Sequence, residues 1–362
     1  MRIDQVVVSA SPGDAITNFA LTLRQLLLPD ARSDVFAYYY DERLASEIVP
    51  LSEYGARPGA RKDRDLLVLH VSIGEPAVAD FVLKRPERLV IIYHNISPSE
   101  PFRPYDPGFA DLLDAGRDEL KRLRPRAELV LADSEYNACE LRDLGFEQVD
   151  VLPIVANVED LRDTEADAAL AERLRTHHDG PVILFVGQLL PHKRADFLIE
   201  AFHILSTYRM RDANLVLVGS HRLPGYAGAL QSQIEELHLD RATLAGSVSK
   251  PMLAAYMRRA DLFVTASEHE GFCVPLLEAM AFDLPFQARR FTAIPETAGD
   301  AGLILDADDG PAVAAEAWAQ LLTDEPLRKT LVERGRVRLA AFEPAVTKQA
   351  WRQALLGLAR LA

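Results

Sequence analysis

The chain contains little cysteine. Cys139 and Cys273 are its two cysteines among 362 residues. Two thiols cannot form a disulfide framework or supply the four thiolates of a structural zinc site. The nine histidines show no His-Glu-x-x-His spacing, so Glu268-His269-Glu270 is not interpreted as a metal site, and Asp306-Ala307-Asp308 is interpreted as a helix cap. We therefore expect no redox chemistry and no bound metal.

A long hydrophobic run and an excess of basic residues are also lacking. No stretch approaches the roughly 18 to 20 apolar residues of a membrane helix, and Met1-Arg2-Ile3-Asp4 leads directly into a strand-like run instead of a signal peptide. Lys and Arg number 40 against 54 Asp and Glu, giving a formal net charge of -14. This charge argues against nucleic acid as a partner. We expect a cytoplasmic protein.

Apolar, β-branched runs alternate with helical patterns along the chain, and 49% of the residues are hydrophobic. The runs form two series, separated by an acidic, alanine-rich stretch over residues 157–180. The expected strands are residues 5–9, 66–71, 89–93, 129–132 and 149–153 in the first series, then 182–187, 215–219, 243–246, 262–266, 285–288 and 303–305 in the second. Continuous apolar strands between helices are typical of a parallel sheet covered on both faces. The pattern predicts an α/β protein with two Rossmann-like, doubly wound domains.

The expected domains are residues 1–165 and 166–342, followed by a helix over 343–362. Ligands bind outside the carboxyl ends of the strands in such sheets, so two facing domains would form a cleft. The final segment has an amphipathic pattern that fits either an ordinary terminal helix or a helix that crosses back to the first domain.

The most informative stretch is Ser267 to Ala281, which follows an expected strand. Pro275 is a natural residue for a helix start, so the loop before it ends at a helix N-terminus that can bind a phosphate. Glu270 and Glu278 stand on either side of this start, and carboxylates accept paired hydrogen bonds from the diols of ribose or a sugar. The loop is therefore a candidate site for a nucleotide sugar.

A second loop, Val186 to Arg194, lies between another strand and a helical pattern. Gly187 allows a phosphate to approach the backbone, and Lys193 supplies a cation for charge that develops on a leaving diphosphate. Gln188 stands between them. Further strand ends carry Gly219 and the pair Ser247 and Val248.

These motifs resemble glycosyltransferase family 4, which contains retaining transferases of GT-B fold. The match is strong over residues 181–306 and rests on the Glu-x7-Glu spacing of Glu270 and Glu278 and on the Lys193 loop. The resemblance implies that Glu270 serves the donor sugar and Glu278 the ribose. The implied donor-binding residues are Gly13, Gly187, Gln188, Lys193, Gly219, Ser247, Val248, Gly271, Phe272, Cys273, Val274 and Glu278. The family usually has arginine at Gln188, so either Arg194 replaces that cation or Gln188 donates a neutral hydrogen bond.

The first domain shows a weaker resemblance. Gly13 follows the first strand, and His94 in Tyr93-His94-Asn95 closes another. The family places such a histidine beside the donor sugar, which makes His94 a candidate catalytic residue with Lys193 and Glu270. The Gly-Asp-Ala-Ile and Tyr-His-Asn-Ile segments resemble bacterial polysaccharide and O-antigen mannosyltransferases, so GDP-mannose is favoured over UDP-sugars.

The resemblance implies a metal-independent, retaining hexosyltransferase that acts on a glycan or a lipid-linked glycan acceptor. Two alternatives stay open: a catalytically silent nucleotide-sugar-binding subunit, suggested by Gln188, and another GT-B enzyme such as an epimerase or a phosphorylase. A basic run from Arg117 to Arg126 fits a solvated helix face or peripheral contact with the inner face of a membrane.

Overall fold

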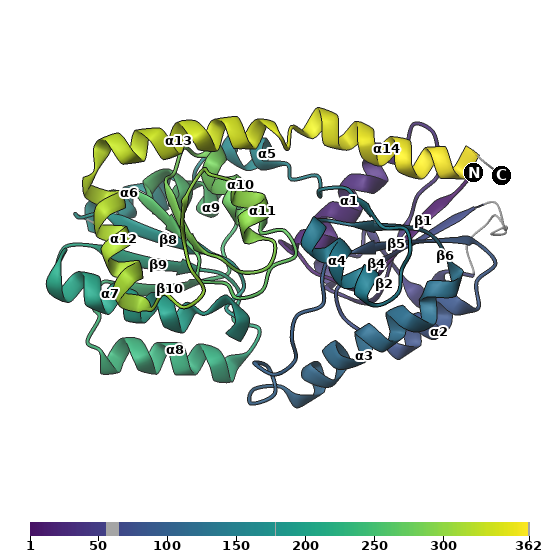
Figure 1. The fold of residues 1–362 in the computed structure, drawn as a ribbon, viewed down its shortest axis with the longest axis horizontal. Helices are drawn as coiled ribbons and strands as arrows, with labels where there is room; N and C mark the ends of the chain where they lie inside the picture. The colour runs from purple at the N-terminus through teal and green to yellow at the C-terminus, as the bar shows by residue number, and fades with distance from the viewer. Residues whose placement is uncertain (56–64, 178, 361–362) are drawn as a thin grey trace. The chain divides into compact units, whose positions relative to one another are not determined.

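The computed structural model describes residues 1–55, 65–177 and 179–360, which form two α/β units (Figure 1). Unit 1 comprises Met1–Glu100, Pro107–Ala156 and Phe342–Ala362, and unit 2 comprises Pro101–Asp106 and Asn157–Ala341. The division at Ala156/Asn157 falls earlier than the expected boundary at 165/166. The short helix α5 (Val158–Arg162) explains this position, because it packs against helices α9 and α10 of unit 2.

Unit 1 is built on a seven-stranded parallel sheet with the order β3-β2-β1-β4-β5-β6-β7. Its strands are β1 (Ile3–Ala10), β2 (Val35–Tyr40), β3 (Ile48–Pro50), β4 (Leu66–Val71), β5 (Arg88–Tyr93), β6 (Ala127–Ala132) and β7 (Asp150–Val151). Its helices are α1 (Ala15–Leu27), α2 (Pro76–Leu83), α3 (Pro107–Leu123), α4 (Glu135–Asp143) and α14 (Pro344–Arg360), with short 3-10 turns at Glu42–Leu44, Leu51–Glu53 and Arg124–Arg126. Every residue of the central strand β4 is buried, as a strand covered on both faces requires.

The sequence patterns did not predict β2 and β3. The second half of β2, Tyr38 to Tyr40, is exposed, and β3 spans three residues that end at Pro50. These strands lie at one end of the sheet, where burial on both faces is incomplete and proline is tolerated.

The C-terminal helix α14 belongs to unit 1, which decides between the two interpretations of its amphipathic pattern. Trp351 is fully buried, packs against Phe19 of α1 with 5.0 Å between ring centroids, and donates from Nε1 to the Pro153 carbonyl at 2.8 Å. Arg88 of β5 donates to the Leu358 carbonyl at 2.9 Å. The helix is thus a structural part of the first α/β unit.

Unit 2 contains a six-stranded parallel sheet with the order β10-β9-β8-β11-β12-β13. Its strands are β8 (Val182–Val186), β9 (Asn214–Val218), β10 (Ala242–Gly246), β11 (Leu262–Val264), β12 (Phe286–Arg289) and β13 (Leu303–Leu305). Besides α5, its helices are α6 (Ala168–His177), α7 (Ala195–Tyr208), α8 (Pro224–Glu236), α9 (Lys250–Arg259), α10 (Val274–Ala281), α11 (Ile294–Ala298), α12 (Pro311–Thr323) and α13 (Glu325–Ala340), with a 3-10 turn at Pro191–Lys193. Two doubly wound parallel-sheet units confirm the predicted fold class.

Candidate functional site

The strand order of unit 2 brings the two most informative loops together. β8 and β11 are neighbours although the chain forms β9 and β10 between them, so the order reverses at this point of the sheet. Lys193 follows β8 and Glu270 follows β11. Both side chains therefore lie at the carboxyl edge of the sheet, at its topological switch point, where open α/β sheets bind ligands.

Lys193 and Glu270 form an ion pair at this edge. Lys193 Nζ lies 2.7 Å from Glu270 Oε1, and the two side chains are 19% and 11% exposed. The pair is therefore mostly buried but still partly accessible. It combines a cation suited to a phosphate with a carboxylate suited to sugar hydroxyls.

Thr292 holds the backbone of Glu270 from the loop after β12. Its Oγ1 accepts from the Glu270 N–H at 2.9 Å and donates to the Glu270 carbonyl at 2.9 Å. The φ angle of Thr292 is 47°, a conformation that a β-branched residue rarely adopts. Sequence reasoning missed this residue because its spacing from Glu270 fits no periodic pattern.

Two other residues of these loops also have positive φ angles: Arg194 (53°) and Cys273 (72°). His238 and Asp283 do as well, but each directly follows the end of a helix, where a left-handed residue is ordinary. Arg194 likewise follows the end of the 3-10 turn Pro191–Lys193, so the positive φ angles that no preceding helix explains are those of Cys273 and Thr292. Strained backbone of this kind tends to occur at functional sites.

Helix α10 begins at Val274, and its first amides have no partner within the helix. Cys273 forms the N-cap through its backbone alone, and its thiol is buried. Burial, together with the nearby Glu270 carboxylate, raises the pKa of this thiol well above its usual value. Cys273 is therefore an unreactive thiol, and the helix start is open to an anion between Gly271 and Val274.

Glu278 lies in α10, and burial raises the pKa of its carboxyl to about 7. Within the described part of the chain, no hydrogen bond or ion pair reaches its side chain. A half-buried carboxyl without a partner is costly when ionised, and hydrogen-bond donors of a ligand would offset that cost.

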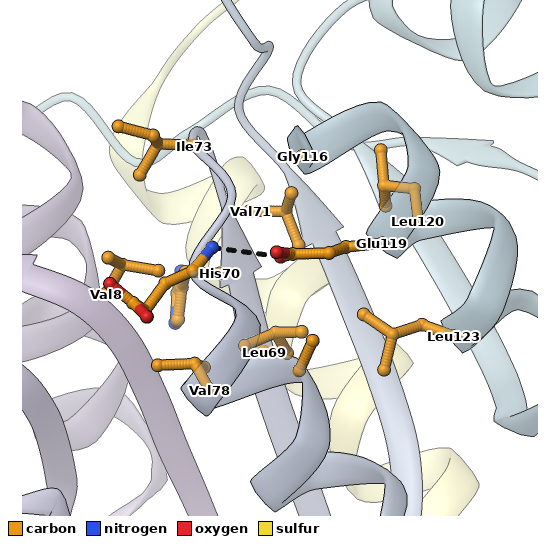
Figure 2. Close-up of a pocket in the computed structure, with 12 residues that line it drawn as sticks. Val8, Leu69, His70, Val71, Ile73, Val78, Gly116, Glu119, Leu120 and Leu123 are labelled. Carbon is orange, nitrogen blue, oxygen red and sulfur yellow. Dashed lines mark hydrogen bonds between the residues drawn. The ribbon is translucent and has the colours of Figure 1, made fainter. Parts of the chain in front are cut away.

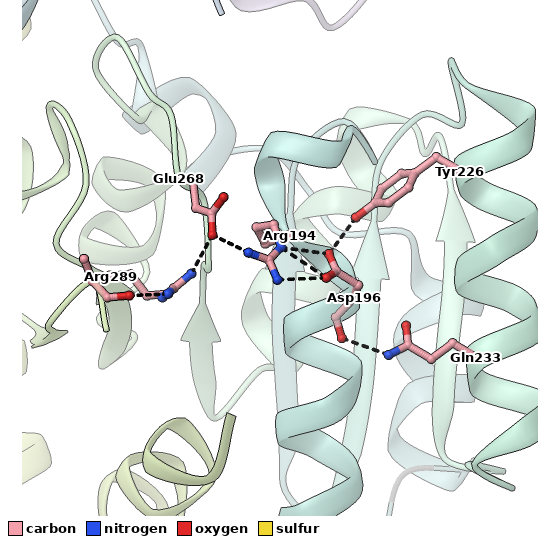
Figure 3. Close-up of polar contacts among 7 residues, drawn as sticks. Arg194, Asp196, Tyr226, Gln233, Glu268 and Arg289 are labelled. Carbon is pink, nitrogen blue, oxygen red and sulfur yellow. Dashed lines mark hydrogen bonds and ion pairs between the residues drawn. The ribbon is translucent and has the colours of Figure 1, made fainter. Parts of the chain in front are cut away.

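Arg194 is held by two carboxylates (Figure 3). Its guanidinium contacts Asp196 at 3.1 Å and forms an ion pair with Glu268. Tyr226 donates to Asp196 at 2.9 Å, and Arg289 reaches Glu268 at 3.2 Å. In this structure these contacts engage the Arg194 side chain between the loops after β8 and β11.

Gly219, which follows β9, is tightly packed. Gly219 donates to the Gly246 carbonyl at 3.0 Å, and a Cβ on Gly219 would lie 1.6 Å from the Gly187 carbonyl oxygen. Close packing of the loops after β8, β9 and β10 therefore demands glycine here. Ser247 is exposed beyond this contact, and Val248 is half-buried.

Gly219→Ala is expected to destabilise unit 2 by about 3 kcal/mol, because the new methyl group meets backbone instead of a side chain that can move. The matched control is Gly228→Ala in α8, where a Cβ has open space, and it should stabilise by about 1 kcal/mol. Chemical denaturation of both variants measures the difference. Equal stability of the two would contradict the packing described above.

Two candidate residues lie in unit 1. Gly13 has a φ angle of 79° between β1 and α1, and nothing lies within 4 Å of a Cβ there, so conformation and not space favours glycine. His94 follows β5, and its side chain is 4% exposed. Its Nδ1 lies 2.7 Å from Asp133 Oδ2 and its Nε2 lies 2.9 Å from His70 Nδ1. Both ring nitrogens are thus engaged within unit 1.

Within residues 1–55, 65–177 and 179–360, no group of three or more His, Cys, Asp or Glu side chains is arranged to hold a metal ion. The expected helix cap at Asp306 to Asp308 is wrong. Helix α12 begins at Pro311 after Gly310, without a capping side chain, and Asp306 pairs with Arg290 at 2.9 Å.

The basic run of α3 and the turn after it is engaged locally. Arg117 contacts Glu140, Lys121 contacts Asp118, Arg122 contacts Asp80, and Arg124 and Arg126 donate to main-chain carbonyls. Among the helices of the described residues, none is both long enough and apolar enough to span a membrane.

Comparison with known proteins adds independent findings. Residues 168–338 match the family described as glycosyl transferases group 1. N-acetyl-alpha-D-glucosaminyl L-malate synthase of Bacillus anthracis is 27% identical over 309 residues, which cover 83% of this chain and 75% of that protein. O-antigen chain mannosyltransferase B of Escherichia coli is 30% identical over 165 residues, which cover 44% of this chain and 41% of that protein.

Among solved structures, Anabaena HepE in complex with UDP-glucose matches with a TM-score of 0.76 at 18% identity, covering 99% of this chain and all of that one. At this identity the likeness shows the fold alone. It is the GT-B fold that the sequence motifs implied.

Proposed function

We propose that this chain moves a hexose from a nucleotide sugar to a hydroxyl acceptor with retention of configuration. The match of residues 168–338 to the group 1 glycosyl transferases, which identifies a glycosyltransferase, supports this proposal. The observation that carries this proposal is the Lys193–Glu270 ion pair. It lies at the topological switch point of unit 2, and Glu270 belongs to the loop that leads to the start of α10.

The donor diphosphate would bind at the start of α10, where the first amides have no partner within the helix and the helix dipole favours negative charge. Lys193 would turn from Glu270 to a phosphate oxygen and stabilise the charge that develops as the diphosphate leaves. Glu270 would then accept hydrogen bonds from the sugar hydroxyls, with its backbone fixed by Thr292. These residues supply the stabilisation that the reaction needs, so we propose that it proceeds without a metal.

Glu278 would accept hydrogen bonds from the ribose hydroxyls. His94 would act from unit 1 through its backbone carbonyl, since both of its ring nitrogens are engaged. The retained configuration and these two roles follow the family resemblance of the motifs.

The proposed donor is GDP-mannose, with UDP-sugars as the second choice. The segments around Gly13 and His94 support mannose, and one curated relative is named an O-antigen chain mannosyltransferase. One neighbour in structure holds UDP-glucose. The proposed acceptor is a glycan or lipid-linked glycan of polysaccharide synthesis, met at the inner face of the membrane.

The first test is a thermal shift assay with GDP, UDP and ADP and their sugar conjugates, with and without EDTA. A ligand at about 100 times its Kd adds about 2.7 kcal/mol to the free energy of unfolding. Stabilisation by one nucleotide in EDTA supports the site and identifies the base. Absence of any shift contradicts it.

A catalytically silent nucleotide-sugar-binding subunit is the second candidate function. The observation in its favour is that Gln188 lacks the usual cation while Arg194 is committed to Asp196 and Glu268. This candidate function predicts that the donor binds but that no sugar is transferred to any acceptor. A donor-only assay also separates transfer from epimerisation, because an epimerase converts the donor without an acceptor.

Glu278→Gln is expected to change stability and donor binding in opposite directions. The pKa of Glu278 rises from 4.5 to about 7 on folding, so the wild type loses stability as pH rises from 4.5 to 7. The variant lacks this loss and should be more stable above pH 7 and equal to wild type below pH 4.5. Its donor affinity should be at least tenfold weaker at pH 8, where the wild-type carboxylate is ionised. Denaturation and titration at several pH values test both effects, and a variant less stable than wild type at pH 8 would refute the first.

A further inference from the structure

A chain of buried polar side chains crosses the sheet of unit 1, passes through His94 and ends at Asp133. Gln5 Oε1 lies 2.9 Å from His70 Nε2, His70 Nδ1 lies 2.9 Å from His94 Nε2, and His94 Nδ1 lies 2.7 Å from Asp133 Oδ2. Gln5, His70 and Asp133 are between 0% and 3% exposed. Sequence analysis identified His94 alone, although Gln5 and His70 are polar residues inside apolar strands.

The direction of each hydrogen bond is fixed from the Gln5 end. Gln5 Nε2 lies 3.0 Å from the Ala20 carbonyl, which can only accept, so this atom is the amide NH2 and Oε1 faces His70. Because Oε1 also only accepts, His70 Nε2 must carry a proton. Burial and the neighbouring His94 lower the pKa of His70 well below its usual value, so His70 is neutral and its Nδ1 is bare.

The same reasoning determines which nitrogen of His94 carries a proton. Bare His70 Nδ1 must accept from a proton on His94 Nε2. If His94 were neutral and Asp133 ionised, a bare Nδ1 would face a carboxylate oxygen at 2.7 Å, which places two acceptors in contact. One more proton removes this conflict, whether it lies on His94 Nδ1 or on Asp133 Oδ2.

The environment of Asp133 is consistent with an extra proton on the His94–Asp133 pair. Its other oxygen, Oδ1, is buried without a hydrogen-bond partner, an arrangement that is far less costly for a neutral pair than for an isolated carboxylate. Burial raises the pKa of Asp133, which favours retention of the proton.

The surroundings hold the chain in place and contribute few other charges. Phe19 packs edge-on against both histidine rings and against Trp351 of α14. His70 lines a cavity of about 10 Å³ together with Glu75 and Glu119 (Figure 2). Glu119 Oε2 accepts from the Glu75 backbone N–H at 2.9 Å, and burial raises the pKa of Glu119.

On the side of α3 and α4, the nearest charges are paired with each other. Arg117 contacts Glu140 at 2.9 Å, and Glu140 accepts from the Tyr93 hydroxyl at 2.7 Å. The ionisable groups on the elements around the His94–Asp133 pair therefore include His70, Glu75 and Glu119 at the cavity, and the Arg117–Glu140 ion pair.

We propose that Gln5 and His70 are positioning residues that force His94 to carry its proton on Nε2 and thereby keep one shared proton on the His94–Asp133 pair. The pair is then neutral as a whole and holds the His94 backbone in one orientation. In a catalytic triad, by contrast, the carboxylate accepts a hydrogen bond from histidine Nδ1–H and the other ring nitrogen is bare, so that it can act as a base.

The first experiment is imidazole nitrogen NMR of the full chain labelled with 15N, from pH 6 to 8.5, with His94→Gln to assign the His94 signals. The expected result is a proton on His94 Nε2 at every pH. A bare Nε2 at any pH in this range would overturn the proposal. This measurement needs no activity, so its outcome is independent of the proposed function.

The second experiment compares substitutions and rests on the proposed function. In Asp133→Asn the amide NH2 donates to His94 Nδ1, so the Nε2 proton should persist and kcat should fall less than tenfold. Asp133→Leu cannot donate, and His70→Phe removes the acceptor of the Nε2 proton, so each should lower kcat more than tenfold. If Asp133→Asn folds with an unchanged thermal midpoint but loses transfer as completely as Asp133→Leu, the carboxylate has the triad role and the proposal is wrong. Should His70→Phe not fold, the wild-type NMR result decides.

Discussion

Glu270→Ala is expected to lower kcat at least a hundredfold and to reduce stability far less. The proposed role of Glu270 is to accept hydrogen bonds from the donor sugar, and a buried charge-assisted hydrogen bond contributes about 1.5 to 3 kcal/mol. Steady-state transfer kinetics and chemical denaturation measure the two effects. If the wild type is active and Glu270→Ala is equally active, the role assigned to Glu270 is refuted.

The ion pair adds a second, sharper expectation for the same variant. In the free protein Lys193 Nζ lies 2.7 Å from Glu270, so a phosphate must compete with this carboxylate for the cation. Removal of Glu270 should leave the affinity for the nucleoside diphosphate alone unchanged or higher, while the affinity for the nucleotide sugar falls. Glu236→Ala, an exposed acid at the end of α8, is the matched control and should change neither affinity. A parallel loss of affinity for both ligands would instead indicate a damaged loop.

The sequence predicted the elements of the fold that are buried on both faces. Strand β4 agrees with the expected residues 66–71, and β8 agrees with 182–187 to within one residue, because continuous apolar runs between helices specify such strands. β2 and β3 were missed since exposed tyrosines and Pro50 weaken their strand pattern at the end of the sheet.

The residues of the candidate site also differ in whether the sequence could predict them. Glu270 and Glu278 could be found because a local loop and helix start carry them. Thr292 could not, since it meets Glu270 only through the packing of the loop after β12, 22 residues away in sequence. His70 and Asp133 are 24 and 39 residues from His94 and join it across neighbouring strands. The available signal was a polar residue, His70, inside an apolar strand. Such a residue indicates a buried polar network but does not show which residues it contacts.

Lys193→Ala is expected to lower kcat by about 10² to 10³, the usual cost of removing one group that stabilises developing negative charge. The cost should be near the upper end because Gln188 is uncharged and Arg194 is held by Asp196 and Glu268. Lys193→Arg keeps the charge and should recover part of the rate. Nucleoside diphosphate affinity should also fall in Lys193→Ala, in contrast to its behaviour in Glu270→Ala.

A double-mutant cycle separates the ion pair from the chemistry. Each single substitution leaves a half-buried charge without its partner, whereas the double variant removes both, so the stability losses should be less than additive by about 1 kcal/mol. For transfer the two residues act on different parts of the donor, Lys193 on the leaving diphosphate and Glu270 on the sugar. The double variant should therefore be at least as slow as the slower single variant. Full activity of Lys193→Ala would mean that another group stabilises the negative charge on the leaving diphosphate.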